Sequence, residues 1–498
     1  MNAAQVNTKD IQGLVRFGYA ALTEACFFLL NIRDVASARS WLSSAPISAA
    51  EELPVPPTTA LQVAFTREGL AALEVSGELL GGFSAEFLSG MSGEESRSRR
   101  LGDVGASSPQ TWLWGGPGNV PHMLVMFYAQ PGKLSPWIQS LQTVHWIAAF
   151  GVLATLDTSD LKGKEPFGFN DGISQPTPDW KRERTAPTDE LTYGNLVSLG
   201  EFLLGYPNEY GKYSYRPVLS PDASCSSVLA FAEDQPNKRD FGLNGTYLVL
   251  RQLEQDVRGF WRFLDGQTVP NALARQNLAE AMVGRRMDGT PLLPLRSAGV
   301  PGIDANSAKQ NSFTYDLDRE GTRCPFGAHI RRANPRNADL PASTGPVSRL
   351  LHTLGFGNPL YRDDVIASTR FHRMIRRGRE YGPKLTPDQA ISEQADTAER
   401  GINFICIVAN ILRQFEFVQN SWIVNTKFDG LTEESDPLLG NRQAIAGCPF
   451  TDTYSQPQPD DARNRTTGLP QFVTVRGGAY FFLPSLSAVR YLVAIGQK

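Results

Sequence analysis

Histidine is scarce in this chain, which has five among 498 residues, and one of them lies in a strongly basic segment. The segment FGAHIRRANPR, residues 326–336, places small residues before His329 and three arginines after it. Small neighbours allow a flat cofactor to approach the imidazole, and guanidinium groups pair with carboxylates in a bidentate manner. A tetrapyrrole with two propionates needs both a nitrogen ligand for its iron and cations at its edge. The segment therefore predicts a haem site with His329 as the iron ligand, against the simpler alternative of an ordinary packed histidine.

The haem would be the non-covalent b type, because the sequence has no CxxCH motif for thioether attachment. A second segment, FGFNDG at residues 167–172, holds Asp171 between turn-forming residues. Asn-Asp-Gly is most often only a turn. A turn can nevertheless present a carboxylate to a cavity, where it could accept a proton from hydrogen peroxide and return it to the leaving oxygen.

A third segment, RFHRMIRRGREYG at residues 370–382, carries five arginines. Arg370, Arg373 and Arg377 have helical spacing. The Arg-Arg-Gly sequence at residues 376–378 suits the end of a helix or strand. A buried arginine facing an iron would stabilise negative charge that develops on a departing oxygen. The alternatives are a solvated basic helix and a patch that binds phosphate or nucleic acid.

The elements that must position these segments follow a repeated strand-then-helix order. In the first half, apolar runs of strand length are followed by segments with helical spacing, and the second half repeats this order. The expected strands of the first half are at residues 24–32, 59–66, 121–129 and 147–157. Those of the second half lie within 245–255, 402–410 and 471–483, the last as two short strands. This order predicts an α/β or α+β sandwich built from a duplicated unit. A Gly- and Pro-rich stretch at residues 166–240 separates the halves, so we expect domains at 1–165 and 241–498 with a loop-rich linker between them.

Composition narrows the class of protein. The net charge of −3 gives no global field for nucleic acid or anionic membranes. The five cysteines are scattered without paired spacing, which argues against a disulfide framework or a zinc site. No apolar run reaches the length of a membrane span, and the N-terminus shows neither an apolar signal segment nor twin arginines. These features predict a cytoplasmic protein.

The three segments, in this order, resemble those of the dye-decolorising peroxidase family. Gly168, Asp171 and Gly172 match its GxxDG signature, AHIRRANPR its proximal-histidine segment and MIRRG its distal-arginine segment. The segments NFICIVANILRQFEFVQNSW and GLPQFVTVRGGAYFFLPSL look like its C-terminal core, so the resemblance spans nearly the whole chain. It is closest to the longer bacterial and fungal-like branch.

The resemblance implies two ferredoxin-like α+β units with antiparallel sheets and peripheral helices, and one haem b held mainly by the C-terminal half. It implies His329 as axial ligand, Arg331 as a propionate partner, Asp171 and Arg376 as the distal pair, and apolar distal positions at Ile402 and Phe404. Asp171 would move a proton between the oxygens of hydrogen peroxide, and Arg376 would stabilise charge during heterolysis. Dyes, phenols or other aromatic donors would then be oxidised in one-electron steps.

Several features stay open at this stage. Many relatives have an aspartate where this chain has Asn410, and that aspartate accepts the proximal imidazole N–H, so a weaker ligand histidine is expected unless Glu416 or another acid replaces it. Tyr381 is a candidate surface radical site, with ordinary packing as the alternative, and manganese oxidation is unassigned. Homo-oligomers are common in the family. The chain stops at RYLVAIGQK without a targeting tail, so an encapsulating shell is not expected. A haem-binding or haem-trafficking protein with little turnover is the competing function.

Overall fold

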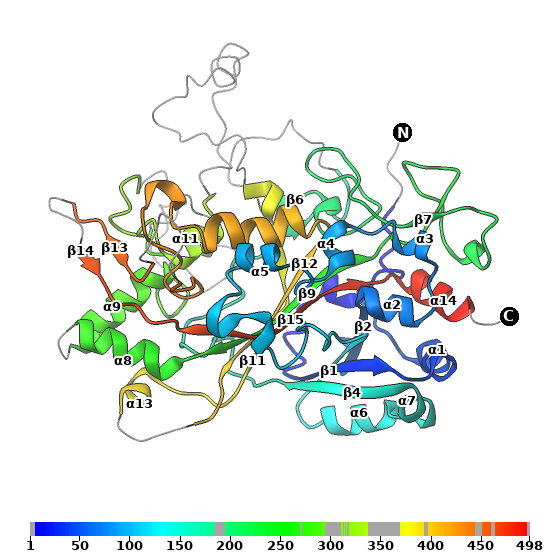
Figure 1. The fold of residues 1–498 in the computed structure, drawn as a ribbon, viewed down its shortest axis with the longest axis horizontal. Coiled ribbons are helices and arrows are strands. Elements are labelled where there is room, and N and C mark those ends of the chain that lie inside the picture. The colour runs from blue at the N-terminus through cyan, green and yellow to red at the C-terminus, as the bar shows by residue number, and fades with distance from the viewer. Residues whose placement is uncertain are drawn as a thin grey trace, which may run out of the picture.

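Residues described by the computed structural model are 5–183, 195–268, 271–293, 310–311, 313, 315, 318–336, 369–392, 397–443, 451–459 and 464–495. The central feature is one antiparallel sheet of nine strands, in the order β10-β12-β9-β15-β2-β3-β1-β4, with β11 paired to β12. Figure 1 shows the sheet running through the molecule, with α8 and α9 near one end and α1, α6 and α7 near the other. The fold is therefore α+β, as the sequence predicts.

The first half forms a four-stranded unit in the order β2-β3-β1-β4. Its strands agree closely with the predicted apolar runs: β1 (Glu24–Ile32), β2 (Thr59–Phe65), β3 (Met123–Ala129) and β4 (Phe150–Asp157). Its helices include α1 (Val35–Ser44), α2 (Arg67–Ala72), α5 (Glu95–Leu101), α6 (Leu134–Leu141) and α7 (Val144–Ala149). The second strand therefore pairs with the third, the third with the first and the first with the fourth.

The second half repeats this order with β10-β12-β9-β15. Its elements are β9 (Thr246–Gln255), α8 (Val257–Gln267), α9 (Ala272–Val283), α11 (His329–Ala333), β10 (Ile375–Arg376), β11 (Arg379–Tyr381), α13 (Pro387–Ile391), β12 (Gly401–Val408), β15 (Val473–Leu483) and α14 (Leu486–Ala494). In both halves the strand order is second, third, first, fourth, so the predicted duplication is present in the topology. Phe482 of β15 pairs with Phe65 of β2, which joins the two units into one sheet.

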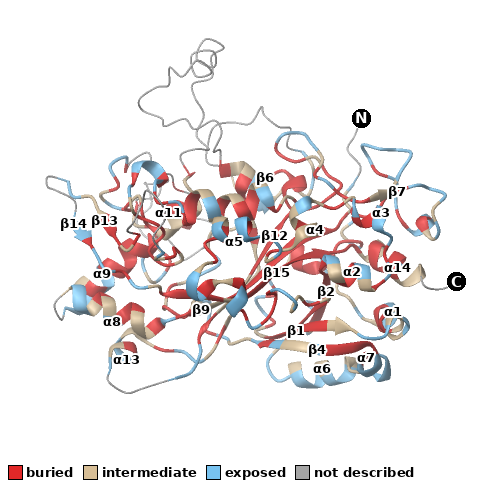
Figure 2. Cartoon of the chain, in the orientation of Figure 1, coloured by how far each residue is buried: buried red, intermediate tan, exposed pale blue. Residues whose placement is uncertain are grey.

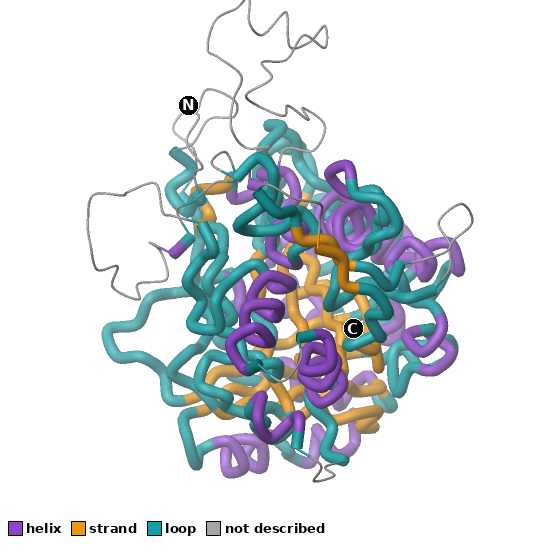
Figure 3. Tube along the Cα trace, turned by 90° about the vertical axis from the view of Figure 1, so that its left-hand side faces the viewer, coloured by secondary structure: helices purple, strands orange, loops and turns teal. Residues whose placement is uncertain are grey.

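Both faces of the sheet are covered, which explains the continuous apolar runs. Alternate residues of a strand point to opposite faces, and Phe28 and Leu30 of β1 join one core cluster while Phe27 and Leu29 join another. Figure 2 shows this burial along the strands, whereas α6 and α7 carry exposed residues. Figure 3 shows the strands in the interior, with helices and loops outside them.

Three local expectations need correction. The two short strands expected after residue 471 are the single strand β15, whose register shifts between Val475 and Gly477. The arginine-rich segment is not a helix, because a short 3-10 turn (η7, Thr369–His372) leads into β10 and β11. The helix expected after β12 is wound as π-helix in two parts, η8 (Leu412–Glu416) and η9 (Val418–Ile423).

The stretch between β4 and β9 has only short elements where it is described: β5 (Thr177–Pro178), β6 (Leu196–Val197), β7 (Val218–Leu219), β8 (Arg239–Asp240) and the turns η4 (Leu199–Glu201) and η5 (Ser226–Val228). Cys26, Cys225, Cys324 and Cys406 are free thiols, and Cys448 lies outside the described residues. Among the helices that the structure describes, none is both long and apolar enough to cross a membrane.

Candidate active site

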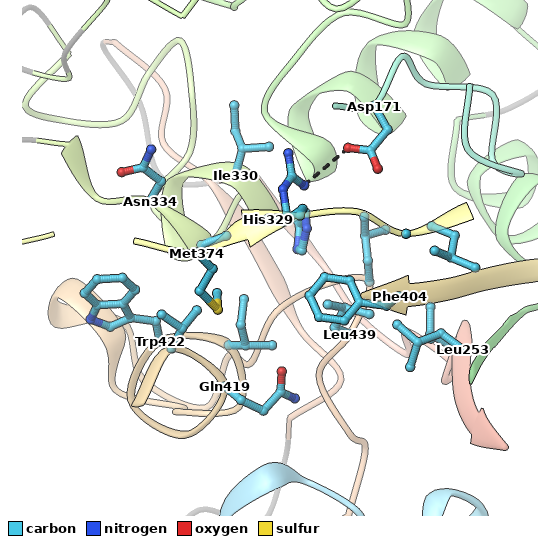
Figure 4. Close-up of a pocket in the computed structure, with 18 of the residues that line it drawn as sticks. Asp171, Leu253, His329, Ile330, Asn334, Met374, Phe404, Gln419, Trp422 and Leu439 are labelled. Carbon is cyan, nitrogen blue, oxygen red and sulfur yellow. Dashed lines mark hydrogen bonds and ion pairs between the residues drawn. The ribbon is translucent and has the colours of Figure 1, made fainter. Parts of the chain in front are cut away.

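A cavity of about 300 Å³ lies against the sheet of the second half and is lined by five of the six residues that the sequence singled out: Asp171, His329, Arg376, Ile402 and Phe404. Strand pairing explains how three of them share one wall. Arg376 of β10 lies opposite Cys406 of β12, and alternate residues of a strand point to the same face. Phe404 and Ile402 therefore continue the face that Arg376 begins, and Figure 4 shows Phe404 at the cavity.

His329 is the first residue of α11, and its ring is held by a buried carboxylate. Its Nδ1 lies 2.8 Å from Oδ2 of Asp436, a residue with no solvent exposure. The other oxygen of Asp436 accepts from the backbone N–H groups of Leu438 and Leu439 at 2.9 and 2.8 Å. Because the carboxylate accepts the Nδ1 proton, Nε2 carries the lone pair, which is the form a metal requires.

Electrostatics reinforce this arrangement. Burial by itself would raise the pKa of the Asp436 carboxyl, but the charge of His329 and the hydrogen bond from its ring bring the pKa below its usual value. Burial by itself would lower the pKa of His329, and Asp436 outweighs it, so that the pKa is raised. The pair therefore favours a charged Asp436 and a strongly basic imidazole.

Asp436 is the other acid that the sequence left open as a replacement at Asn410. The Asn410 side chain accepts from the backbone N–H of Arg413 at 2.8 Å and does not bond to the histidine. Glu416, the other acid considered, pairs with Arg97 at 2.8 Å and accepts from Tyr480. The carboxylate partner of His329 thus comes from a segment 107 residues further along the chain, and sequence reasoning missed it.

Asp171 and Arg376 meet although 205 residues separate them in the chain. Nη1 of Arg376 lies 3.2 Å from Oδ1 of Asp171, and the dashed line in Figure 4 marks this contact. The side chain of Asp171 is 41% exposed and that of Arg376 is 33% exposed, so both are accessible to small molecules that enter the cavity. The predicted distal pair is therefore assembled on one side of the cavity.

The loop that carries Asp171 is fixed by its backbone. Gly168 and Gly172 have φ values of 104° and 76°, in the left-handed region that favours glycine, which accounts for both glycines of the signature. The two oxygens of Glu165 accept from the N–H groups of Phe167 and Phe169, each at 2.9 Å. Burial chiefly, with a smaller effect of Asp171, raises the pKa of Glu165 to about 7.

Arg331 is the exception among the predicted residues. Its guanidinium donates to Oδ2 of Asp318 at 3.1 Å and to the carbonyl of Cys324 at 2.6 Å, and it does not line the cavity. The physical reason is helical geometry, since residues two apart on a helix point in different directions and His329 already faces the cavity. Arg331 is a buried cation that these protein groups already bind, and its pairing with a propionate stays a prediction.

Two other buried arginines line the cavity instead, Arg285 and Arg336. Nη1 of Arg285 donates to the carbonyls of Gly289 and Gln310, while its buried Nη2 has no hydrogen-bond partner within the described ranges. Burial and then the charge of Arg336 lower the pKa of Arg285 to about 10. Two adjacent buried cations and an unsatisfied N–H create a place where a carboxylate would be stabilised.

The remaining arginines do not form a solvated patch. Arg377 and Arg379 donate to main-chain carbonyls of the N-terminal segment, residues 14–22. Burial lowers the pKa of Arg377 to about 10. Arg377 and Arg379 are therefore bound to the protein's own main chain, which argues against a free basic patch at these two residues.

Two aromatic candidates are also placed. Tyr381 is 9% exposed and does not line the cavity, which favours the packing interpretation over a surface radical site. His372 lines the cavity, and its ring stacks on Phe417 with centroids 3.8 Å apart. The His372 ring serves the aromatic packing of the cavity wall.

Comparison with known proteins gives the class to which this fold and site belong. No family model matches the chain. The chain is 30% identical to Peroxidase 2 of Mycetinis scorodonius over 98% of its own length and 88% of that protein. It is 28% identical to the dye-decolorizing peroxidase msp1 of the same organism, over 99% of the chain and 89% of the relative. The solved structure of a fungal DyP-type peroxidase from Auricularia auricula-judae superposes with a TM-score of 0.73 at 25% identity, covering 99% of this chain and all of that one.

These relatives span the molecule from end to end and include the segments that build the cavity. The chain belongs to the dye-decolorising peroxidase family, and it is a peroxidase. The family is haem-dependent, and the described residues fit haem: an imidazole with its Nδ1 side satisfied, an apolar wall at Ile402 and Phe404, and an unsatisfied buried cation at Arg285.

Proposed function

We propose that the chain binds one non-covalent haem b in this cavity, with His329 as iron ligand and Asp436 as the partner that keeps the ring in place. Arg285 and Arg336 would hold the propionates, and Ile402 and Phe404 would cover the distal face. The Nη2 of Arg285, which has no hydrogen-bond partner among the described residues, is the observation that supports the position of the propionates.

Haem supplies the redox centre at which hydrogen peroxide is cleaved and from which aromatic donors are oxidised one electron at a time. The protein supplies the proton movement. Asp171 accepts the proton of the inner peroxide oxygen and delivers it to the outer oxygen, so that the outer oxygen leaves as water. Arg376, 3.2 Å from Asp171, stabilises the negative charge that develops on the leaving oxygen.

The contact between Asp171 and Arg376 is the single observation that carries the proposal, since a haem carrier would not need an acid–base group beside a cation. The competing haem-trafficking function is also not favoured by relatives that are named as peroxidases. Small phenols and dyes are the donors that the family membership supports.

The test is rapid mixing of haem-loaded protein with hydrogen peroxide, followed by Soret absorbance. Asp171→Asn is expected to slow the peroxide-dependent change by about 10²–10⁴-fold, the usual contribution of a positioned acid–base group. Asp160→Asn is the matched control, because Asp160 is in the same region but pairs with Lys162 outside the cavity. A variant at Asp171 that reacts as fast as the wild type would remove Asp171 from the mechanism.

A further inference from the structure

The cavity has a second polar end beyond Phe404. Four polar residues line it there: Asp103, Ser107, Arg251 and Gln471. Arg251 of β9 lies directly opposite Phe404 of β12 in the sheet register, so the two side chains share the cavity face. Asp103 follows the left-handed Gly102 that ends α5. This end of the cavity is therefore contiguous with the distal wall but built from different elements than the Asp171 loop.

Asp103 and Arg251 form an ion pair that is almost fully buried. Nη2 of Arg251 donates to Oδ1 of Asp103, and the residues are 3% and 2% exposed respectively. Two atoms of the pair are left over: Nε of Arg251 and Oδ2 of Asp103 are buried and have no hydrogen-bond partner in the part of the chain that the structure describes. Because buried polar atoms are rarely left unsatisfied, a donor and an acceptor beside a cavity can take up a hydrogen-bonding group that enters it.

The chemistry of the two atoms defines that molecule. A carboxylate oxygen accepts from a hydroxyl group, and a guanidinium N–H donates to the same hydroxyl oxygen or to a neighbouring one. The surrounding wall is apolar and aromatic, with Phe404, Phe415 and Val475 among the lining residues. The guanidinium carbon of Arg251 lies 5.9 Å from the ring centroid of Phe415. A small ring that bears a hydroxyl group satisfies both the polar and the apolar parts.

We propose that Asp103 and Arg251 form a binding subsite for a small phenolic electron donor inside the active-site cavity. The proposal rests on the peroxidase function proposed above. When the phenol O–H bond breaks, its proton would pass to Oδ2 of Asp103. Its electron would pass to the enzyme that hydrogen peroxide has already oxidised, which leaves a phenoxyl radical. One hydrogen peroxide and two phenols then give two waters and two phenoxyl radicals. Burial raises the pKa of Asp103 to about 6, although Arg251 opposes this effect, and such a carboxylate can accept and release a proton near neutral pH.

The subsite shares its cavity with the proposed haem, so the space beside the haem restricts the subsite to small donors. Bulky dyes would have to be oxidised elsewhere on the protein. The proposal therefore predicts that the two substrate classes respond differently to changes at Asp103.

The test variant is Asp103→Asn, which keeps the shape of the side chain and an oxygen for Arg251 but replaces the free acceptor by an N–H donor. The control is Asp240→Asn, the same change in another buried ion pair, Arg216–Asp240, whose residues do not line the cavity. The double variant Arg251→Gln with Asp103→Asn serves if the single variant does not fold, because it leaves no unpaired buried charge.

Phenol itself is the probe, and its binding to the resting haem-loaded protein is measured by paramagnetic relaxation of the phenol protons, which requires no turnover. The dissociation constant is expected to rise at least about tenfold in Asp103→Asn and in the double variant and to stay unchanged in Asp240→Asn, in line with the loss of one hydrogen bond to a charged group. The KM for phenol should rise with it, while kcat/KM for a bulky anthraquinone dye stays constant.

An unchanged dissociation constant in the Asp103 variants would overturn the proposal and would assign the two unsatisfied atoms to bound water. A parallel loss of phenol and dye oxidation would also overturn it, because the effect would not be specific to small donors. Absence of any reaction of the wild type with peroxide would instead count against the proposed function, and the binding measurement would still decide whether phenol contacts Asp103.

Discussion

Asp436→Asn tests whether Asp436 orients His329 as the iron ligand. In the wild type the carboxylate accepts three hydrogen bonds, from His329 at 2.8 Å and from two backbone N–H groups at 2.9 and 2.8 Å. The asparagine oxygen can still accept from the backbone groups. Its amide N–H then faces Nδ1 of His329, and two donors oppose each other unless the ring changes tautomer, which would put a proton on Nε2 and remove the lone pair from the cavity.

The magnitude follows from the bond that is lost. A hydrogen bond to a charged group contributes about 1.5–3 kcal/mol, and here the acceptor has no solvent exposure to compensate. The expected loss of affinity for haem iron is therefore about 10- to 150-fold, which overlaps the 10–100-fold that loss of such partners usually costs in metal sites. The reduction potential should also rise, because the buried negative charge that stabilises the oxidised iron is removed.

The assay is titration of the haem-free protein with haemin, followed by spectroelectrochemical measurement of the potential. Asp240→Asn, a buried aspartate in an ion pair outside the cavity, controls for a general effect of losing a buried charge. Equal haem affinity and equal potential in Asp436→Asn and the wild type would refute the argument and would mean that His329 is not the ligand or that Asp436 does not orient it.

Three further predictions concern the remaining parts of the cavity. Arg285→Gln should weaken haem binding by about tenfold, as expected for one charge-assisted hydrogen bond, whereas Arg331→Gln should lower the melting temperature and leave the haem affinity of the folded protein unchanged; the reverse result would restore Arg331 as the propionate partner. Glu165 has its pKa raised from 4.5 to about 7, so the folded state binds more protons than the unfolded state between these values and stability falls as pH rises from 4.5 to 7. In Glu165→Gln the free energy of unfolding, measured with urea at pH 5 and pH 7, should lose this dependence on pH. An unchanged pH dependence would show that it does not come from Glu165. Phe404→Ala should open the distal wall and raise the rate with cumene hydroperoxide relative to hydrogen peroxide, and a constant ratio of the two rates would show that Phe404 does not limit access.

Local pattern was enough to predict most of the longer strands of the sheet, but not the short strands β10 and β11. The strand β1 was expected at residues 24–32 and β3 at 121–129, because each is an apolar run bounded by polar or turn-forming residues, and both lie within two residues of those limits. Arg370–Gly382 was misjudged as helical in spacing. The spacing of its arginines reflects separate partners, Asp171 for one and carbonyls of residues 14–22 for two others, and such partners are invisible to a periodicity argument.

The site residues divide in the same way. His329 and Arg376 stand in arginine-rich segments whose composition is unusual on its own. Asp171 stands in an ordinary Asn-Asp-Gly turn and is singled out only by its place in the order of the three segments. Asp436 stands in the segment EESDPLLG, where nothing distinguishes it from any other acid before a proline. Its role comes from a contact across 107 residues, and only the folded chain contains that information.

The duplicated topology gives the two halves equivalent strands with different surroundings, and this difference locates the site. β3 occupies the same position in the first unit as β12 in the second, and every residue of β3 is buried. In β12 only Ile402 and Phe404 are less than fully buried, and both line the cavity. Packed side chains thus fill both faces of β3, whereas β12 borders a cavity between the Asp171 loop and α11. A flat apolar cofactor placed there would complete a core that the described side chains leave open, which agrees with the proposed haem site in the second half although both halves share one strand order.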